Sequence, residues 1–176
     1  MTEGMVSGVA IDLEKEEILL GLTLVPTKPQ GCYGLPGGRI ETGETPLRAL
    51  KREWAEEVLK SGKAGRKIKT SGKRTEMPRT GPNGNYVHHF YNVRLPVGEL
   101  KIHETAGEIG PPQWIPISKI TSGEVKMFFA HLKGTILVLE KMACKSAKAA
   151  YLTKELSKYA HWDSKLENLT KAIFGV

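Results

Sequence analysis

The sequence has few of the features that mark secreted, membrane-spanning or disulfide-rich proteins. It contains two cysteines, Cys32 and Cys144, which lie far apart and belong to no CxxC pair, so neither a disulfide framework nor a zinc knuckle is indicated. No apolar run approaches the roughly 20 residues of a membrane span, and nothing resembles a signal peptide. These absences predict a cytoplasmic protein with free thiols and no membrane partner.

What is present is ordinary for a soluble protein: 40% of the 176 residues are hydrophobic and 26% are charged. This length suits one domain with a sizeable core. We expect that domain to cover residues 1–143. Residues 144–176 are expected to form a helical extension that packs on the same domain or makes a homodimer contact.

The most informative stretch is residues 37–60, GGRIETGETPLRALKREWAEEVLK. Its glutamates Glu53, Glu56 and Glu57 are spaced i, i+3, i+4, which places three carboxylates on one face of a helix. Thr45 is a good N-cap for that helix. Adjacent like charges repel one another, whereas Mg²⁺ prefers a few carboxylate oxygens together with water and substrate phosphate. The stretch therefore predicts a helix that carries a metal site.

A glycine turn precedes this helix, because Leu35-Pro36-Gly37-Gly38 cannot continue a strand ladder. At Gly37 and Gly38 the backbone is able to pass close to a metal ion or a phosphate. Glu44 follows in the loop. Arg52, beside the glutamates, is suited to hold one carboxylate in place through a bidentate contact.

Six positions match the Nudix box, Gx5Ex7REUxEExGU, in spacing and in every charged residue: Gly38, Glu44, Arg52, Glu53, Glu56 and Glu57. The chain thus resembles the Nudix hydrolase family. Two positions depart from the box, since Trp54 replaces an aliphatic residue and Leu59 replaces the final Gly. We expect the helix to continue past Leu59 and to end near Ser61-Gly62. The resemblance implies an α/β fold, a mixed β-sheet sandwiched between α-helices, here with extra C-terminal helices.

The resemblance also implies an enzyme, a pyrophosphohydrolase that uses Mg²⁺, or Mn²⁺ as a substitute, to cleave a diphosphate linkage. Glu53 and Glu57 are the expected direct metal ligands, with Glu56 joining them or bridging through water. Arg52 is expected to orient a glutamate. Glu44 or Glu108 is left as base or extra ligand.

Glu108 lies six residues before Trp114, as a site glutamate does in mutator-type nucleoside triphosphatases. An acid in a surface loop is the equal alternative for Glu108, and Glu104 is another candidate for the site. The expected substrate is a small molecule, a nucleoside triphosphate or a nucleotide sugar such as ADP-ribose, and we favour the triphosphate. Three alternatives stay open: a solvated glutamate-rich helix, a non-catalytic nucleotide sensor on a Nudix fold, and a pyrophosphohydrolase that acts on RNA 5′ ends.

The net charge of +7 comes entirely from residues 60–79, which hold eight basic side chains and one acidic residue, Glu76. This segment is interpreted either as a solvated loop or as a positive collar for polyphosphate or nucleic acid. No aromatic residue is interleaved before Tyr86, so short anionic ligands fit better than single-stranded nucleic acid.

Histidines 88 and 89 invite a metal or catalytic interpretation, but they fall within a predicted strand, Tyr86–Leu95. Adjacent strand residues point to opposite faces, so the two rings cannot chelate one ion, and packed histidines are favoured. Elsewhere the patterns predict three further features: a hairpin of Met5–Ile11 with Ile18–Val25, a helix over Lys126–Cys144, and a helical tail interrupted by a turn at His161–Ser164.

Overall fold

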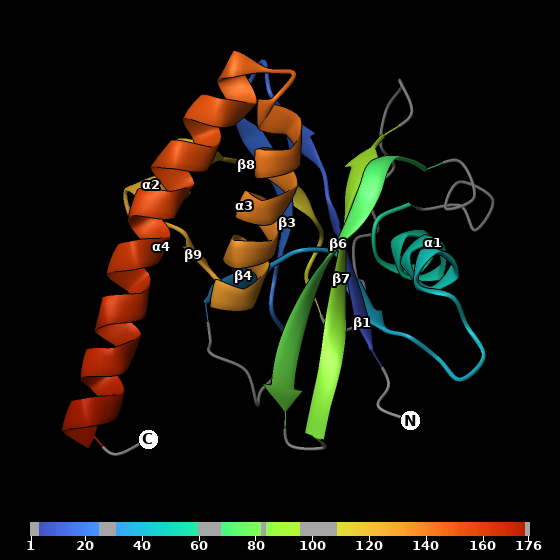
Figure 1. Cartoon of the computed structure of the whole chain (residues 1–176), viewed down its shortest axis with the longest axis horizontal. Coiled ribbons are helices and arrows are strands. Elements are labelled where there is room, and N and C mark those ends of the chain that lie inside the picture. The colour runs from blue at the N-terminus through green and yellow to red at the C-terminus, as the bar shows by residue number, and fades with distance from the viewer. Residues whose placement is uncertain (1–3, 25–30, 60–67, 82–83, 96–108, 175–176) are drawn as a thin grey trace.

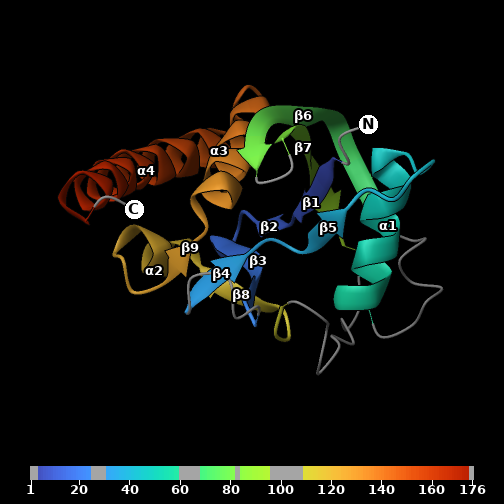
Figure 2. The ribbon, with the colours of Figure 1, turned by 90° about the horizontal axis from the view of Figure 1, so that it is seen from below.

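A computed structural model describes residues 4–24, 31–59, 68–81, 84–95 and 109–174 of the chain. Two β-sheets form its centre, with helices at both ends (Figures 1 and 2). The first sheet has the strand order β5 (Gly37–Arg39), β1 (Met5–Val9), β7 (Gly84–Arg94), β6 (Lys69–Gly81). The second has the order β2 (Ile11–Asp12), β3 (Glu17–Leu22), β4 (Cys32–Gly34), β9 (Lys126–Met127), with β8 (Gln113–Pro116) paired to β3. The mixed α/β fold expected from the sequence is confirmed.

The sequence predicted that Met5–Ile11 would pair with Ile18–Val25 in a hairpin, and this is wrong for β1. This strand runs parallel to β7 and antiparallel to β5, while only Ile11–Asp12 pairs with the start of β3. Val6 and Val9 are fully buried and belong to different core clusters, so β1 is covered on both faces. A strand buried on both faces suits the middle of a sheet, and a parallel partner is common there.

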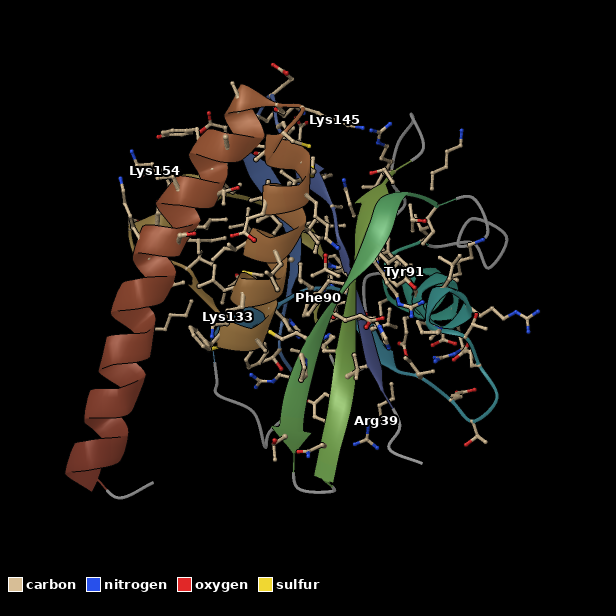
Figure 3. All side chains as sticks on the ribbon, in the orientation of Figure 1. Arg39, Phe90, Tyr91, Lys133, Lys145 and Lys154 are labelled. Atoms are coloured by element: carbon tan, nitrogen blue, oxygen red, sulfur yellow. The ribbon has the colours of Figure 1, made fainter. Side chains whose placement is uncertain are left out.

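Helix α1 (Pro46–Glu57) covers one face of the first sheet, and α3 (Phe129–Ala143) covers the other (Figure 1). The two faces of β7 separate as the alternation predicts. Phe90 points toward α3 and Tyr91 toward α1 (Figure 3), and each joins the core cluster on its own side. The arrangement of one helix on each face of the sheet is confirmed.

Each helix packs closely because a glycine leaves room for an aromatic ring. On the α1 side, a Cβ atom at Gly8 of β1 would collide with the indole of Trp54. On the α3 side, a Cβ atom at Gly134 would collide with the ring of Phe90. Trp54 and Phe90 are both fully buried. Trp54 therefore serves as a core residue at the position where the Nudix box has an aliphatic one.

The start of α1 is as predicted, but its end is not. Thr45 caps the helix by accepting a hydrogen bond from the Arg48 amide at 3.4 Å. The helix stops at Glu57, because the Leu59 amide bonds back to the Trp54 carbonyl and the Leu59 side chain is buried in the core. The apolar side chain turns the chain inward where the box normally has glycine. Ser61-Gly62 lies outside the described residues.

The C-terminal helices also differ from expectation. Lys126–Met127 forms β9, and α3 begins only at Phe129. The short α2 (Ile117–Thr121) precedes them, and α4 (Ala147–Phe174) follows as one continuous helix, so the predicted turn at His161–Ser164 is wrong. No Gly or Pro occurs within α4 to break it.

Early residues of α4 pack on the core, whereas its far end extends past α3 (Figure 1). The core contacts come from Ala149, Leu152 and Leu156, and α4 touches both α2 and α3. The division at residue 143 and a dimer role for 144–176 stay predictions. In the described part of the chain, every helix is too short or too polar to cross a membrane.

Part of the basic segment is a strand. Residues 69–81 form β6, which pairs with β7 over its length apart from a register shift between Ser71 and Thr75. The solvated-loop interpretation is therefore wrong for this half of the segment. The hydrogen bonds between β6 and β7 explain the difference, because they hold in a strand a segment whose composition alone suggests a loop. Residues 60–67 lie outside the described part.

Candidate functional site

Arg52 is the centre of the acidic cluster on α1. Its Nε and Nη2 donate to the two carboxylate oxygens of Glu44 at 3.3 and 3.1 Å. Its Nη1 donates to Glu53 at 2.9 Å and to Glu56 at 3.4 Å. The Nη2 atom also donates to the Arg39 carbonyl at 2.9 Å. One guanidinium therefore ties the helix to the end of β5 and to the loop that follows it.

Glu57 is fixed by the backbone of the glycine turn. Its Oε2 accepts a hydrogen bond from the Gly37 amide at 2.8 Å, and the side chain is only 7% exposed. Gly37 has φ of 145°, and a Cβ atom there would collide with the Val6 carbonyl. Glycine is thus required for this turn, and the turn aims its N–H at the helix.

Gly38 contributes to the same cluster because it has no side chain. A Cβ atom on Gly38 would collide with the carboxylate of Glu53, which is 13% exposed. The second glycine of the turn therefore leaves space for a carboxylate beside β5. Both glycines lie next to the glutamates that the sequence marked as metal ligands.

The two buried carboxylates differ in basicity. Burial raises the pKa of Glu53 above its usual value, and the contacts from Arg52 oppose that rise. Burial alone would raise the pKa of Glu44 too, but hydrogen bonds from Arg52 and the Glu41 amide hold it below its usual value. Glu53 is therefore the better candidate to bind a cation, which would compensate its burial, and Glu44 remains an anion paired with Arg52.

The residues fit a divalent cation by donor chemistry. Glu53, Glu56 and Glu57 offer hard carboxylate oxygens, and burial raises the pKa of Glu53 despite its contacts with Arg52. Over residues 4–24, 31–59, 68–81, 84–95 and 109–174, no three acidic, His or Cys side chains already converge as an ion-binding group. Arg52 instead holds Glu53 and Glu56, the latter 58% exposed.

The structure brings together most of the residues selected from sequence. Glu44, Arg52, Glu53 and Glu56 form one contact group, and Glu57 and the two glycines adjoin it. Glu108 and the alternative Glu104 lie outside the described residues, so their roles stay predictions. The same holds for the basic residues between 60 and 67.

His88 and His89 lie on opposite faces of β7, as the strand periodicity requires. Ser7 Oγ lies 2.9 Å from His88 Nε2, and the His88 ring stacks on Phe90 with 4.1 Å between centroids. Burial lowers the pKa of His88 to about 2, so the ring is neutral. His89 is on the α1 face and lines a groove beside Glu44. His88 is a packed core histidine.

Three contacts at the site carried no signal that sequence reasoning used. The Glu41 amide donates to Glu44 at 3.2 Å, the Arg39 carbonyl accepts from Arg52, and His131 Nδ1 accepts from the Leu35 amide at 2.9 Å. The E-T-G-E turn with Gly43 at φ 80° hints at the first. The last joins residues 96 apart, so local patterns could not reveal it.

Fold and site together define a class: an α/β domain with a carboxylate-bearing helix fastened to a glycine turn. A family model described as the NUDIX domain matches residues 4–133, and the chain belongs to this family. It is a Nudix-type pyrophosphohydrolase. Comparison with curated protein sequences gave no match.

Solved structures with low sequence identity share the fold. A NUDIX hydrolase from Nitrosomonas europaea has a TM-score of 0.59 at 16% identity, over 76% of this chain and 86% of that one. The E. coli ORF135 protein has a TM-score of 0.55 at 20% identity, over 82% of this chain and 91% of that one. The third is a bifunctional NMN adenylyltransferase/ADP ribose pyrophosphatase from Francisella tularensis, complexed with AMP and a Mn ion. Its TM-score is 0.56 at 22% identity, over 80% of this chain and 42% of that one.

Proposed function

We propose that this chain hydrolyses a diphosphate linkage in a nucleoside triphosphate or a nucleotide sugar such as ADP-ribose, with Mg²⁺ or Mn²⁺ as cofactor. The observation that carries the proposal is the pairing of the Gly37 amide with Glu57, beside Glu53 held by Arg52. Such contacts fix ligand side chains before a cation arrives, which is how supporting hydrogen bonds tune metal sites.

The residues of α1 have distinct proposed roles. Glu53 and Glu57 hold the cation directly, and the exposed Glu56 completes the set. When bound, the cation neutralises charge on the diphosphate and on the leaving oxygen. Arg52 orients Glu53, and both carboxylate oxygens of Glu44 are occupied by hydrogen bonds from Arg52. Glu44 is thus assigned to holding Arg52, which leaves Glu108 as the proposed base.

The substrate proposal draws on one neighbour and on the basic segment. The neighbour from Francisella tularensis is named for ADP ribose pyrophosphatase activity. The excess of positive charge in residues 60–79 favours a substrate with more phosphate groups, and on this ground the triphosphate is our first choice.

The test is a substrate panel assayed with and without Mg²⁺ or Mn²⁺, comprising nucleoside triphosphates, dinucleoside polyphosphates, nucleotide sugars and capped RNA. We expect metal-dependent turnover of one class. Glu57→Gln should lower kcat by more than ~100-fold, beyond the loss typical of residues that only support a metal ligand. The glutamine Oε1 still accepts from the Gly37 amide, so the fold should persist.

Glu56→Gln is the matched control, since this carboxylate is 58% exposed and its contact with Arg52 is long. A smaller loss is expected for it than for Glu57→Gln, with near-UV circular dichroism unchanged in both. Equal turnover of wild type and folded Glu57→Gln would refute the metal-site assignment. Nucleotide binding without any turnover would instead favour the sensor function.

A further inference from the structure

The glycine turn carries the chain from one sheet to the other. It leaves the second sheet at the end of β4, which pairs with β9, and it joins the first sheet at Gly37, opposite Ser7 of β1. Figure 2 shows β4 on the side of β9 and β5 beside α1. Leu35 and Pro36, between the two strands, belong to neither of them. Their backbone groups therefore need partners from elsewhere in the fold.

The Leu35 amide obtains its partner from α3, on the face of the first sheet opposite to α1 (Figure 1). His131 Nδ1, near the start of α3, accepts a hydrogen bond from this amide at 2.9 Å. A neutral imidazole that accepts at Nδ1 carries its proton on Nε2. Leu35 is 2% exposed, and a buried amide without an acceptor is costly. His131 thus takes the place of the strand partner that the turn lacks.

The ring of His131 is packed on several sides. It meets the ring of Phe128 edge-on with 5.6 Å between centroids, and that of His88 with 5.5 Å. Gly34 lies so close that a Cβ atom there would be 3.2 Å from His131 Nδ1. The Phe128 amide also donates to the Tyr33 carbonyl at 3.0 Å. The start of α3 is therefore joined to β4 and to the turn by hydrogen bonds and by close packing.

The same turn holds the acidic cluster. The Gly37 amide donates to Glu57 Oε2 at 2.8 Å, so the orientation of this carboxylate depends on where the turn places that amide. Glycine restricts its own backbone little, so contacts on either side of Gly37 decide the position of the amide. On one side β5 pairs with β1. On the other are the bond to His131 and a bond of 2.9 Å from the Gly8 amide to the Pro36 carbonyl.

We propose that His131 is a positioning residue for the metal site. By holding the Leu35 amide, it fixes the turn, and the next N–H along the chain, that of Gly37, orients Glu57. The inference rests on the proposed function, in which Glu57 is a direct ligand of the cation. His131 acts here through the turn, as groups that support metal ligands do. Helices on opposite faces of the first sheet thereby serve one site.

The variants for the test differ in whether an acceptor remains at the position of Nδ1. His131→Leu removes the acceptor. His131→Asn keeps one, because its side-chain oxygen is as many bonds from the backbone as Nδ1 is. His131→Gln places the oxygen one bond further out, and it replaces the leucine variant if that one does not fold. Thr135→Val is the matched control, since it removes a buried hydroxyl that donates to the His131 carbonyl at 2.9 Å and leaves the Leu35 contact in place.

The first measurement needs neither metal nor substrate. Hydrogen exchange of the Leu35 and Gly37 amides is followed by NMR on the ¹⁵N-labelled full chain. Loss of the acceptor should speed the exchange of both amides about 10-fold in His131→Leu and His131→Gln. His131→Asn and Thr135→Val should stay within about 3-fold of wild type.

The second measurement is the Kd for Mn²⁺ in the absence of substrate, obtained from the electron paramagnetic resonance signal of the free ion. His131→Leu should raise this Kd about 10-fold, the lower end of the effect seen for groups that support metal ligands. His131→Asn and Thr135→Val should bind Mn²⁺ as wild type does, and Glu57→Gln should bind it most weakly. A residue that only stabilised the fold would lower the free energy of unfolding and leave the Kd unchanged.

Unchanged exchange of the Gly37 amide in folded His131→Leu and His131→Gln would overturn the proposal, and so would equal acceleration in Thr135→Val. No rescue by His131→Asn would assign the effect to ring packing and would also overturn it. Faster exchange with an unchanged Kd, while Glu57→Gln loses the ion, would make His131 a structural residue only. Equal Mn²⁺ binding by wild type and Glu57→Gln would instead refute the metal site itself, and with it the proposed function.

Discussion

The two faces of the first sheet handle polar side chains in opposite ways. On the α1 face, charged groups gather around Arg52, and Glu44 keeps 15% of its side chain exposed. On the α3 face, His88 is 2% exposed, neutral and enclosed by Ser7 and two aromatic or imidazole rings. The difference shows that a titratable residue indicates chemistry only when its partners are known. Burial and the nearby Arg79 charge both disfavour protonation of His88, which serves packing.

The two faces also differ in which element supplies the glycine and which supplies the aromatic ring. On the α1 face the glycine belongs to the strand and the aromatic ring to the helix, whereas on the α3 face the glycine belongs to the helix and the ring to the strand. Both faces thereby bring a helix close to β1 or β7. Close approach on the α1 face also places the glutamates beside the glycine turn.

The largest effect on stability is expected when the α3 contact is broken by Gly134→Ala. The added methyl group collides with Phe90 in a closed core, which should lower the free energy of unfolding by about 1–3 kcal/mol in urea titrations. Glu140→Ala, an exposed change on the same helix, is the control, with a change within ~0.5 kcal/mol. Combining Gly134→Ala with Phe90→Leu should cost less than the sum of both. Additive costs would show that the two residues are not coupled.

On the α1 face, Arg52→Lys tests whether the charged cluster serves activity. Lysine cannot reproduce the two bonds to Glu44 together with the bonds to Glu53 and the Arg39 carbonyl. We expect kcat/KM to fall about 10–100-fold, as for residues that orient metal ligands. Arg48→Lys, an exposed arginine of the same helix, should retain full activity. Identical kinetics for both variants would remove Arg52 from the site.

The smallest effect is a difference in acid stability caused by His88. Its pKa is lowered in the folded state from 6.5 to about 2, so below pH 6.5 the unfolded chain takes up a proton that the folded chain does not. Stability should therefore fall with decreasing pH, by up to about 1.4 kcal/mol per pH unit from this residue. His88→Gln should show a shallower decline between pH 6.5 and 4 in urea titrations. Parallel curves would mean that His88 is protonated within the fold.

The sequence predicted the start of α1 and the proximity of its charged residues, because those signals are local. The roles given to these residues stay predictions. Thr45, the glycine turn and the i, i+3, i+4 glutamates act within one turn or loop of their neighbours, and the helix start and the contact group follow from them. The end of α1 was missed because Leu59 is pulled inward by a core formed from distant strands. The pairing of β1 with β7 was missed for the same reason, since periodicity identifies a strand but not its partner.

Long-range packing also explains the other misses. Glycine is a poor helix former, yet Gly134 within α3 is the residue that lets the helix approach Phe90. The β6 strand was hidden by its basic composition, because pairing with β7 overrides weak strand propensity. His131 contacts the Leu35 amide across 96 residues, and no spacing rule reaches that far.

The acidic cluster is held together by contacts between residues that are close in sequence. Every hydrogen bond that joins Arg39, Glu44, Arg52, Glu53 and Glu56, and the bond from Gly37 to Glu57, spans at most 20 residues of sequence. The groove beside Glu44, by contrast, is assembled from Gly4 through Val87 and His89. The acidic cluster is thus a unit of low contact order, which is able to form early in folding. Side chains of the β6–β7 hairpin can therefore change while every hydrogen bond of that cluster stays in place.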